Sequence, residues 1–193
     1  LFMEQLRVFV AVELPDNIKG ELDSLQEKLK LKRDWGIKTV DAGAMHLTLK
    51  FLGNVPSVQV EEIKSALDEA ARGITPFSLE LKGVGCFPNT RRPRVIWAGL
   101  EFKKGTLDDL QKNIDLALEV LGFPPENRPF TAHLTLARVR ENCLPGHLRR
   151  LGESVAGLDY KPGHVFPIDH FNLMRSILKP QGPEYSVLAR IDL

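Results

Sequence analysis

The sequence predicts an α+β fold: two pseudo-symmetric lobes of antiparallel sheet, with helices packed outside the sheets and a cleft between the lobes. Three observations favour it. Short apolar runs typical of strands alternate with amphipathic segments at helical spacing. The tetrapeptide His-Leu-Thr-Leu occurs at residues 46–49 and again at 133–136, each time in a similar setting of helix, turn and strand, which suggests an internal duplication. No linker or low-complexity tract divides the chain, so we expect residues 1–193 to form a single bilobal domain.

The chain begins with a predicted strand and a predicted helix. Residues 7–12 are apolar and rich in β-branched side chains, as expected of a buried strand. Residues 18–29 then carry leucine and isoleucine at helical spacing, and Asp16 or Asn17 can cap this helix. Residues 36–43 connect the helix to the strand that contains the first tetrapeptide.

A second helix and a hairpin come next. Ser57 is expected to cap the helix, and Gly73 ends it. Residues 77–81 alternate between apolar and polar, as a half-buried strand does. Together with residues 95–100 they predict a hairpin joined by the long loop 85–94.

The last part of the chain predicts two more helices and three more strands. Thr106 and Asp109 resemble a capping box ahead of a third amphipathic helix. A strand with the second tetrapeptide follows a proline-rich loop. The remaining elements are expected to be a short helix at 145–155 and two strand-like runs at 165–176 and 185–193.

Composition limits the classes of function. Hydrophobic residues make up 43% of the chain and charged residues 26%, which is ordinary for a globular protein. The net charge of +1 argues against coating long nucleic acid by charge alone and fits a small anionic group better. Cys86 and Cys143 are expected to be ordinary thiols in a reducing compartment. Because no apolar run reaches the roughly 18 residues of a membrane helix and no signal-peptide pattern is present, we expect a cytoplasmic protein without membrane contact.

The repeated tetrapeptide indicates acid–base chemistry. Successive side chains of a strand point to opposite faces, so His46 and Thr48 share one face, and His133 and Thr135 do the same in the second copy. Imidazole takes or gives a proton near neutral pH, and threonine hydroxyls can hydrogen-bond phosphate oxygens. A lone His-x-Thr is usually surface decoration, but two copies in a chain with five histidines favour function. Two such strands side by side would suit cleavage of a phosphodiester.

Several stretches resemble a known family, the two-histidine (2H) phosphoesterases. They are the paired His-x-Thr-x motifs, residues 9–15 (Phe-Val-Ala-Val-Glu-Leu-Pro), the Leu-Lys-Phe-Leu-Gly sequence at 49–53 and Leu-Ala-Arg at 136–138. The chain is most similar to the RNA 2',3'-cyclic phosphodiesterases, whose bacterial relatives were first described as 2'-5' RNA ligases. A small departure is Ala132, where relatives often have proline. The resemblance covers nearly the whole chain and implies the same fold, with the active site in the cleft.

The resemblance also implies a mechanism. His46 would be the proton donor, His133 the proton acceptor, and the product a 2'-phosphomonoester. The residues alone leave the order of the two roles open, because the motifs are nearly identical. Run in reverse, the same site would join a 2',3'-cyclic end to a 5'-hydroxyl in a 2'-5' linkage. The expected partner is RNA with a 2',3'-cyclic phosphate end, such as a tRNA fragment, bound by a monomer.

No cofactor or metal is expected. His147, His164 and His170 show no metal-ligand spacing with each other or with the cysteines, and neither a dinucleotide loop nor a phosphate loop is present. The alternative from another class is a non-catalytic RNA-end-binding module on the same fold. Hydrolysis of a nucleoside 2',3'-cyclic phosphate in EDTA would distinguish the two, because a pure binder would show none.

Basic side chains supply the candidate phosphate ligands. Alternation places Lys50 on the face of His46 and Thr48, where it could meet phosphate or be a solvated strand-end lysine. Arg138 matches the family's arginine after the second motif, yet strict alternation puts it opposite His133. Either the strand twists or bulges there, or this arginine is structural, and binding of phosphate by Arg138 is left open.

Three arginines and two aromatic residues complete the candidate substrate-binding set. Arg91, Arg92 and Arg94 form a basic loop that is either solvated or grips RNA backbone. Phe51 and Tyr185 could stack on a base. Alternation places Phe51 with the leucines, which favours a core position for it instead.

Overall fold

The computed structural model describes residues 4–31, 35–161 and 163–193, and these contain two antiparallel sheets. The first sheet has the strand order β3-β1-β8-β9, and the second has the order β2-β6-β5-β4-β7. The strands of the first sheet are β1 (Gln5–Glu13), β3 (His46–Pro56), β8 (His170–Lys179) and β9 (Gly182–Asp192). Those of the second are β2 (Ile37–Thr39), β4 (Phe77–Phe87), β5 (Val95–Phe102), β6 (His133–Val139) and β7 (Val165–Ile168).

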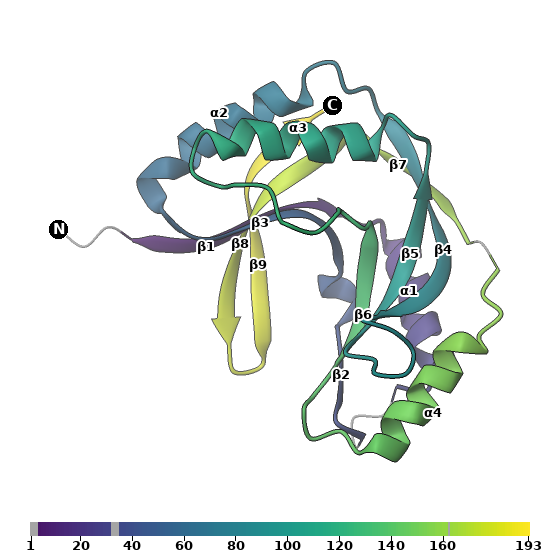
Figure 1. Ribbon diagram of the computed structural model, residues 1–193. Helices are drawn as coiled ribbons and strands as arrows, with labels where there is room; N and C mark the ends of the chain where they lie inside the picture. Colours follow the sequence, from purple (N-terminus) through teal and green to yellow (C-terminus); the bar gives the residue numbers. More distant parts are fainter. Residues whose placement is uncertain (1–3, 32–34, 162) are drawn as a thin grey trace.

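Helices cover the outside of both sheets, as Figure 1 shows. The α-helices are α1 (Asp16–Lys28), α2 (Val60–Ala71), α3 (Leu107–Glu119) and α4 (Pro145–Ala156). Helices α2 and α3 lie side by side against the first sheet, and α1 and α4 lie on the side of the second sheet. Two short 3₁₀ helices, Ala42–Ala44 and Ser57–Gln59, flank β3. The predicted α+β fold with two antiparallel sheets is confirmed.

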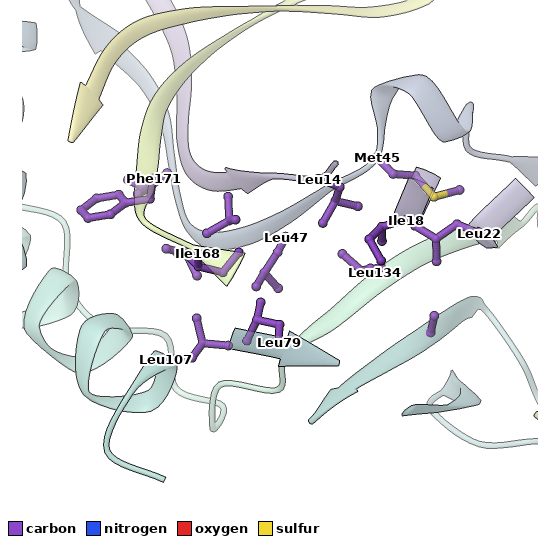
Figure 2. Packing of buried hydrophobic residues seen from close by; sticks show 14 of the residues in the cluster. Leu14, Ile18, Leu22, Met45, Leu47, Leu79, Leu107, Leu134, Ile168 and Phe171 are labelled. Carbon is purple, nitrogen blue, oxygen red and sulfur yellow. The ribbon is translucent and has the colours of Figure 1, made fainter. Parts of the chain in front are cut away.

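Leucines of both tetrapeptides lie in one hydrophobic core that reaches from the first sheet to the second (Figure 2). Leu47 of β3 and Leu134 of β6 are completely buried. Leu79 of β4 and Leu107 of α3 belong to the same cluster. Each tetrapeptide strand is therefore fixed from behind by the core, which leaves its histidine and threonine on the opposite face.

The strand-like run at 165–176 is two strands in different sheets. Residues 165–168 form β7, which pairs with β4 of the second sheet, and β8 from residue 170 on pairs with β1 of the first sheet. Only Asp169 separates them. The alternating pattern did not reveal this change because both strands are half-buried in the same core. The predicted connector 36–43 likewise contains strand β2.

Helix caps differ from those predicted. The side chain of Thr106 makes no capping hydrogen bond, so the predicted capping box with Asp109 is wrong. The Asp108 carboxylate instead accepts hydrogen bonds from the backbone N–H groups of Gly105 and Thr106, at 2.9 Å each. The residue before α1 is Pro15, with no side-chain cap, and Ser57 begins a 3₁₀ turn rather than capping α2.

Candidate active site

Each tetrapeptide strand contains a β-bulge at its fourth residue. Leu49 of β3 is the extra residue without a paired partner in β1, and Leu136 of β6 is the extra residue without a paired partner in β5. A bulge re-aims the side chains that follow it. Beyond the bulges, the next exposed side chains on the histidine and threonine face are Phe51 in β3 and Arg138 in β6. The two motifs thus share a backbone irregularity as well as a sequence.

His46 lies at the start of β3, opposite Glu13 of β1. Its Nδ1 is 3.0 Å from the carbonyl oxygen of Ala44. Because a carbonyl oxygen only accepts hydrogen bonds, Nδ1 carries the hydrogen, and Nε2 holds the lone pair of the neutral ring. The rings of Phe9 and Tyr185 flank the imidazole, with centroids 4.7 and 5.0 Å away.

His133 has the same anchoring in β6. Its Nδ1 is 2.7 Å from the carbonyl oxygen of Thr131, again the residue two positions earlier. The ring of Phe87 approaches it edge to face, with a centroid distance of 5.1 Å. Both imidazoles are therefore held in the tautomer that leaves Nε2 available for proton transfer.

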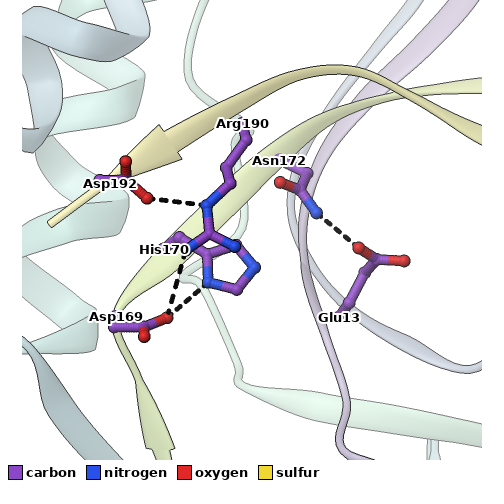
Figure 3. A network of polar contacts seen from close by, with 6 residues as sticks. All are labelled: Glu13, Asp169, His170, Asn172, Arg190 and Asp192. Atoms are coloured by element: carbon purple, nitrogen blue, oxygen red, sulfur yellow. Dashed lines mark hydrogen bonds and ion pairs between the residues drawn. The ribbon is translucent and has the colours of Figure 1, made fainter.

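The surroundings of His46 shift its titration. Burial lowers the pKa of the His46 imidazole below its ordinary value, while the hydrogen bond to Ala44 and the negative charge of Glu13 act in the opposite direction. The carboxylate of Glu13 accepts a hydrogen bond of 2.6 Å from the amide of Asn172, which is buried. Figure 3 shows this contact beside a second polar group, in which Arg190 donates to Asp192.

The two motifs meet at one pocket of about 840 Å³, lined by Thr48 of β3 and His133 of β6. Strands β3 and β6 are in contact, although they belong to different sheets. Other lining residues come from β3, the end of β4, the β4–β5 loop, α3 and the connection from α3 to β6: Phe51, Phe87, Arg94, Asp115, Arg128 and Phe130. The walls of the pocket are thus aromatic and cationic as well as polar.

Tyr185 also connects the two sheets. Burial raises the pKa of its hydroxyl, and the positive charges of Arg138 and Arg7 act against this rise. Arg138 belongs to β6 and Tyr185 to β9, so the arginine of the second motif lies close enough to influence a ring that touches His46. Two imidazoles, two hydroxyls and a guanidinium thus belong to β3 and β6, two strands that contact each other.

Comparison with known proteins shows the family to which the chain belongs. A model described as "LigT like Phosphoesterase" matches residues 12–97 and 101–185, and each segment holds one tetrapeptide. An RNA 2',3'-cyclic phosphodiesterase of Methanocaldococcus jannaschii is 37% identical over 183 residues, covering 95% of this chain and 98% of that protein. The protein of the same name from Methanothermobacter thermautotrophicus is 34% identical over 182 residues, covering 94% and 96%.

The chain belongs to the LigT-like phosphoesterases. Its fold agrees with the crystal structure of TT0787 of Thermus thermophilus, with a TM-score of 0.78 at 32% identity over 97% of this chain and 98% of that one. The predicted family is therefore confirmed, and the protein is an enzyme.

Lys50 of this LigT-like phosphoesterase does not lie on the histidine face, and the expectation from strict alternation is wrong. The bulge at Leu49 turns it inward, where it is only 4% exposed. Its Nζ is 2.5 Å from a carboxylate oxygen of Asp115 in α3 and 2.9 Å from the carbonyl oxygen of Pro124. Its ammonium therefore ties β3 to α3 and to the connection that leads into β6.

Phe51 exchanges places with Lys50. The same bulge turns its ring outward, where it is 45% exposed, so the expected core position is wrong. The ring lies parallel to Phe9 at a centroid distance of 6.0 Å, and the guanidinium of Arg7 lies 4.8 Å from its centroid. Arg138, by the equivalent bulge at Leu136, is exposed on the face of His133. The strand is therefore bulged before Arg138, while phosphate binding by this arginine stays a prediction.

The basic loop of the LigT-like chain divides between two places. Arg94 lines the pocket with the histidine motifs. Arg91 instead lies in a smaller hollow against α4, with Arg149 and Glu153. The backbone N–H groups of Arg91 and Arg92 bind the side chain of Asn89, at 3.0 and 3.1 Å, which forms the turn of the loop.

Residues of this site that sequence reasoning missed include Phe9, Glu13, Arg128 and Phe130. Phe9 and Glu13 stand within the Phe-Val-Ala-Val-Glu-Leu-Pro stretch, where they alternate with the buried valines. This alternation was a signal that they lie on the sheet face away from those valines, where they pair with Phe51 and His46. Nothing in the sequence marks Arg128 or Phe130, because their positions follow from the path of an irregular connection.

No group of three or more histidine, cysteine, aspartate or glutamate side chains is placed to hold a metal ion among residues 4–31, 35–161 and 163–193. Over the same described part of the chain, no helix is long and apolar enough to span a membrane.

Proposed function

We propose that this phosphoesterase hydrolyses the terminal 2',3'-cyclic phosphate of RNA to a 2'-phosphomonoester, with His46 as proton donor and His133 as proton acceptor. One observation carries the proposal: both histidines donate from Nδ1 to the carbonyl two residues earlier, on strands β3 and β6, which contact each other. This leaves two equivalent Nε2 atoms, which is what a reaction with one proton taken and one proton given requires. The names of the full-length relatives from two archaea support the choice of substrate.

The reaction proceeds in one displacement at phosphorus. His133 Nε2 takes a proton from water, and the water oxygen attacks the phosphorus atom. The bond from phosphorus to the ribose 3'-oxygen breaks, and the protonated His46 gives its Nε2 proton to that oxygen. The phosphate remains on the 2'-oxygen. Afterwards His133 is protonated and His46 is neutral, and exchange with solvent restores the starting forms.

Other side chains stabilise the charge that builds on the phosphate. The hydroxyls of Thr48 and Thr135 donate hydrogen bonds to the non-bridging oxygens. Arg138, on the same face as His133 and Thr135, adds a positive charge. Phe51 and Tyr185 supply aromatic surface for a base. When a 5'-hydroxyl replaces water, the same groups would form a 2'-5' linkage.

Product analysis tests the proposal. The purified protein is given a short RNA with a 2',3'-cyclic phosphate end in EDTA, and the products are separated from 2'- and 3'-phosphate standards. We expect the 2'-phosphate alone. His46→Ala and His133→Ala should each lower the rate by about 10²–10⁴-fold with the fold intact, whereas His164→Ala, at a surface ion pair with Glu21, should not. A 3'-phosphate product, or near-full activity in either histidine variant, would contradict it.

The proposal extends to the organisation of the chain. We take residues 1–193 as a single bilobal domain that acts as a monomer in the cytoplasm, on RNA ends such as those of tRNA fragments. Recovery of activity with divalent ions after its loss in EDTA would contradict the expectation that the chain needs no metal.

A further inference from the structure

The pocket extends well beyond the place where a cyclic phosphate would react. Its volume of about 840 Å³ lies near the upper end of the roughly 300–1,000 Å³ of ligand pockets. Of the histidines and threonines in the two motifs, Thr48 and His133 line it. The rest of its wall includes Phe51, the end of β4, the β4–β5 loop, α3 and the connection from α3 to β6. The site therefore has room for a part of the substrate next to the reacting group.

Two arginines in this extension have no ion-pair partner in the part of the chain that the structure describes. Arg94 and Arg128 both line the pocket and are exposed. Within residues 4–31, 35–161 and 163–193, neither guanidinium makes an ion pair or a hydrogen bond with another side chain. The other charged lining residues besides His133 are Lys50 and Asp115, which pair with each other, and Glu126. The extension is thus net positive, as expected of a place that receives a phosphate.

Arg94 stands on a rigid part of the fold. Its backbone N–H donates to the carbonyl of Phe87 at 2.7 Å, and its own carbonyl accepts from the N–H of Val139 at 2.9 Å. It is thereby fixed between β4 and β6. Neighbouring Val95 pairs with Arg138 of the second motif. A fixed backbone position lowers the entropy cost of holding a long side chain on a ligand.

Arg128 lines the same pocket from the connection between α3 and β6. This connection is tied at Pro124 by the buried ammonium of Lys50 and at Thr131 by the ring of His133. Aromatic rings accompany the two arginines, since Phe51, Phe87 and Phe130 line the same pocket. Cations with interleaved aromatic rings are the pattern by which proteins hold single-stranded nucleic acid.

We propose that Arg94 and Arg128 bind the phosphodiester on the 5' side of the reacting nucleotide. The inference rests on the proposed function and names its substrate class: cyclic-ended oligonucleotides are preferred over nucleoside 2',3'-cyclic phosphates. It also separates Arg94 from Arg91 of the same basic loop, because Arg91 lies against α4 and outside this pocket.

Three substrates test the inference: a nucleoside 2',3'-cyclic phosphate, a cyclic-ended dinucleotide, and the same dinucleotide with an uncharged methylphosphonate linkage. We expect the natural dinucleotide to have the highest kcat/KM, and the uncharged linkage to remove most of that advantage. In Arg94→Gln and Arg128→Gln, the ratio of dinucleotide to nucleoside kcat/KM should fall by roughly tenfold, as expected when one charge-assisted hydrogen bond is removed. Arg91→Gln is the matched control and should keep the wild-type ratio.

Salt dependence supplies a second readout. Each arginine that no longer neutralises a phosphate should make the slope of log(kcat/KM) against log salt for the dinucleotide shallower by about 0.7. An unchanged ratio of dinucleotide to nucleoside kcat/KM in the arginine variants, with or without a loss of activity on both substrates, would overturn the inference. The binding of a dinucleotide with a terminal 2'-phosphate, measured by calorimetry with natural and uncharged linkages, separates the two proposals. If hydrolysis is absent yet Arg94 and the linkage charge still govern this affinity, only the proposed function fails.

Discussion

The two histidines have matching hydrogen bonds but unequal surroundings. His46 is enclosed by the rings of Phe9 and Tyr185, and burial lowers its pKa. His133 touches one ring, that of Phe87. A lowered pKa makes protonated His46 a stronger acid, which suits the group proposed to protonate the leaving ribose oxygen. The negative charge of Glu13 acts against this lowering of the His46 pKa.

Glu13→Gln should therefore lower the pKa of His46 further. The carboxylate stabilises the imidazolium, and its removal favours the neutral ring. The limb of the pH profile of kcat/KM that His46 governs should move to lower pH, and an NMR titration of the His46 ring should move with it. Glu4→Gln, just before the opposite end of β1, is the matched control because Glu4 pairs with Arg175. A limb that stays in place or moves upward would show that Glu13 does not act on His46.

Bound substrate should raise the pKa values of both histidines. The negative phosphate attracts the protons on both rings, which raises both pKa values. Repulsion between two cationic rings acts the other way, but the phosphate contacts each ring directly and separates the rings from each other, so its attraction should be the larger effect. The bell-shaped profile of kcat should therefore be centred at higher pH than that of kcat/KM. Both profiles can be measured on a cyclic-ended dinucleotide. A flat profile from about pH 5 to 9 would mean that histidine proton transfer is not part of the slow step.

At the scale of secondary-structure elements, the motif strands could be predicted from the sequence but their bulges could not. Alternation placed His46, Thr48 and the leucines correctly, because the core holds every second side chain. It failed at Lys50 and Phe51, since the extra residue Leu49 is as apolar as a regular core residue would be. Arg138 was the one sign of irregularity in the sequence. Strict alternation put this charged side chain on the core face, and a bulge returns it to the face of His133.

Because the bulge turns Lys50 inward, this lysine of β3 forms an ion pair with Asp115 of α3 and so joins the strand to the helix. Lys50→Met should lower the free energy of unfolding by about 3–5 kcal/mol, because it leaves a carboxylate unpaired near the core. The double change Lys50→Met with Asp115→Leu should recover much of this stability. The exposed pair of Lys82 and Glu101 is the control, and Lys82→Met should cost less than about 1 kcal/mol. Urea denaturation measures all four proteins.

The same series also tests what Lys50 does for activity. Lys50 holds the carbonyl of Pro124, at the start of the connection that ends in Thr131, and Thr131 orients His133. The double variant should therefore be stable yet slow, with kcat lowered more than KM is raised. Full recovery of kcat along with stability would limit Lys50 to a purely structural role.

For the whole molecule, the shared core predicts cooperative behaviour. Leu47 and Leu134 belong to different sheets but to one buried cluster. Leu47→Ala should cost about 2–5 kcal/mol, because apolar packing is removed and a cavity is left behind. It should also lower the urea midpoint seen by the fluorescence of Trp97 in the second sheet. Val58→Ala, at an exposed apolar side chain, is the control. Two separate transitions, with Trp97 unaffected by Leu47→Ala, would mean that the sheets unfold independently.

The order of the strands has a consequence for the making of the protein. Strand β1 is among the first elements synthesised, yet its place in the sheet is between β3 and β8, and β8 and β9 are the last strands of the chain. While the ribosome is still translating residues 170–192, β1 has one neighbour instead of two, and the Tyr185 wall beside His46 is missing. Both His-Leu-Thr-Leu sequences are synthesised before the strands that complete their surroundings exist. A nascent chain of this enzyme therefore carries all four motif side chains before the strands that complete the site are in place.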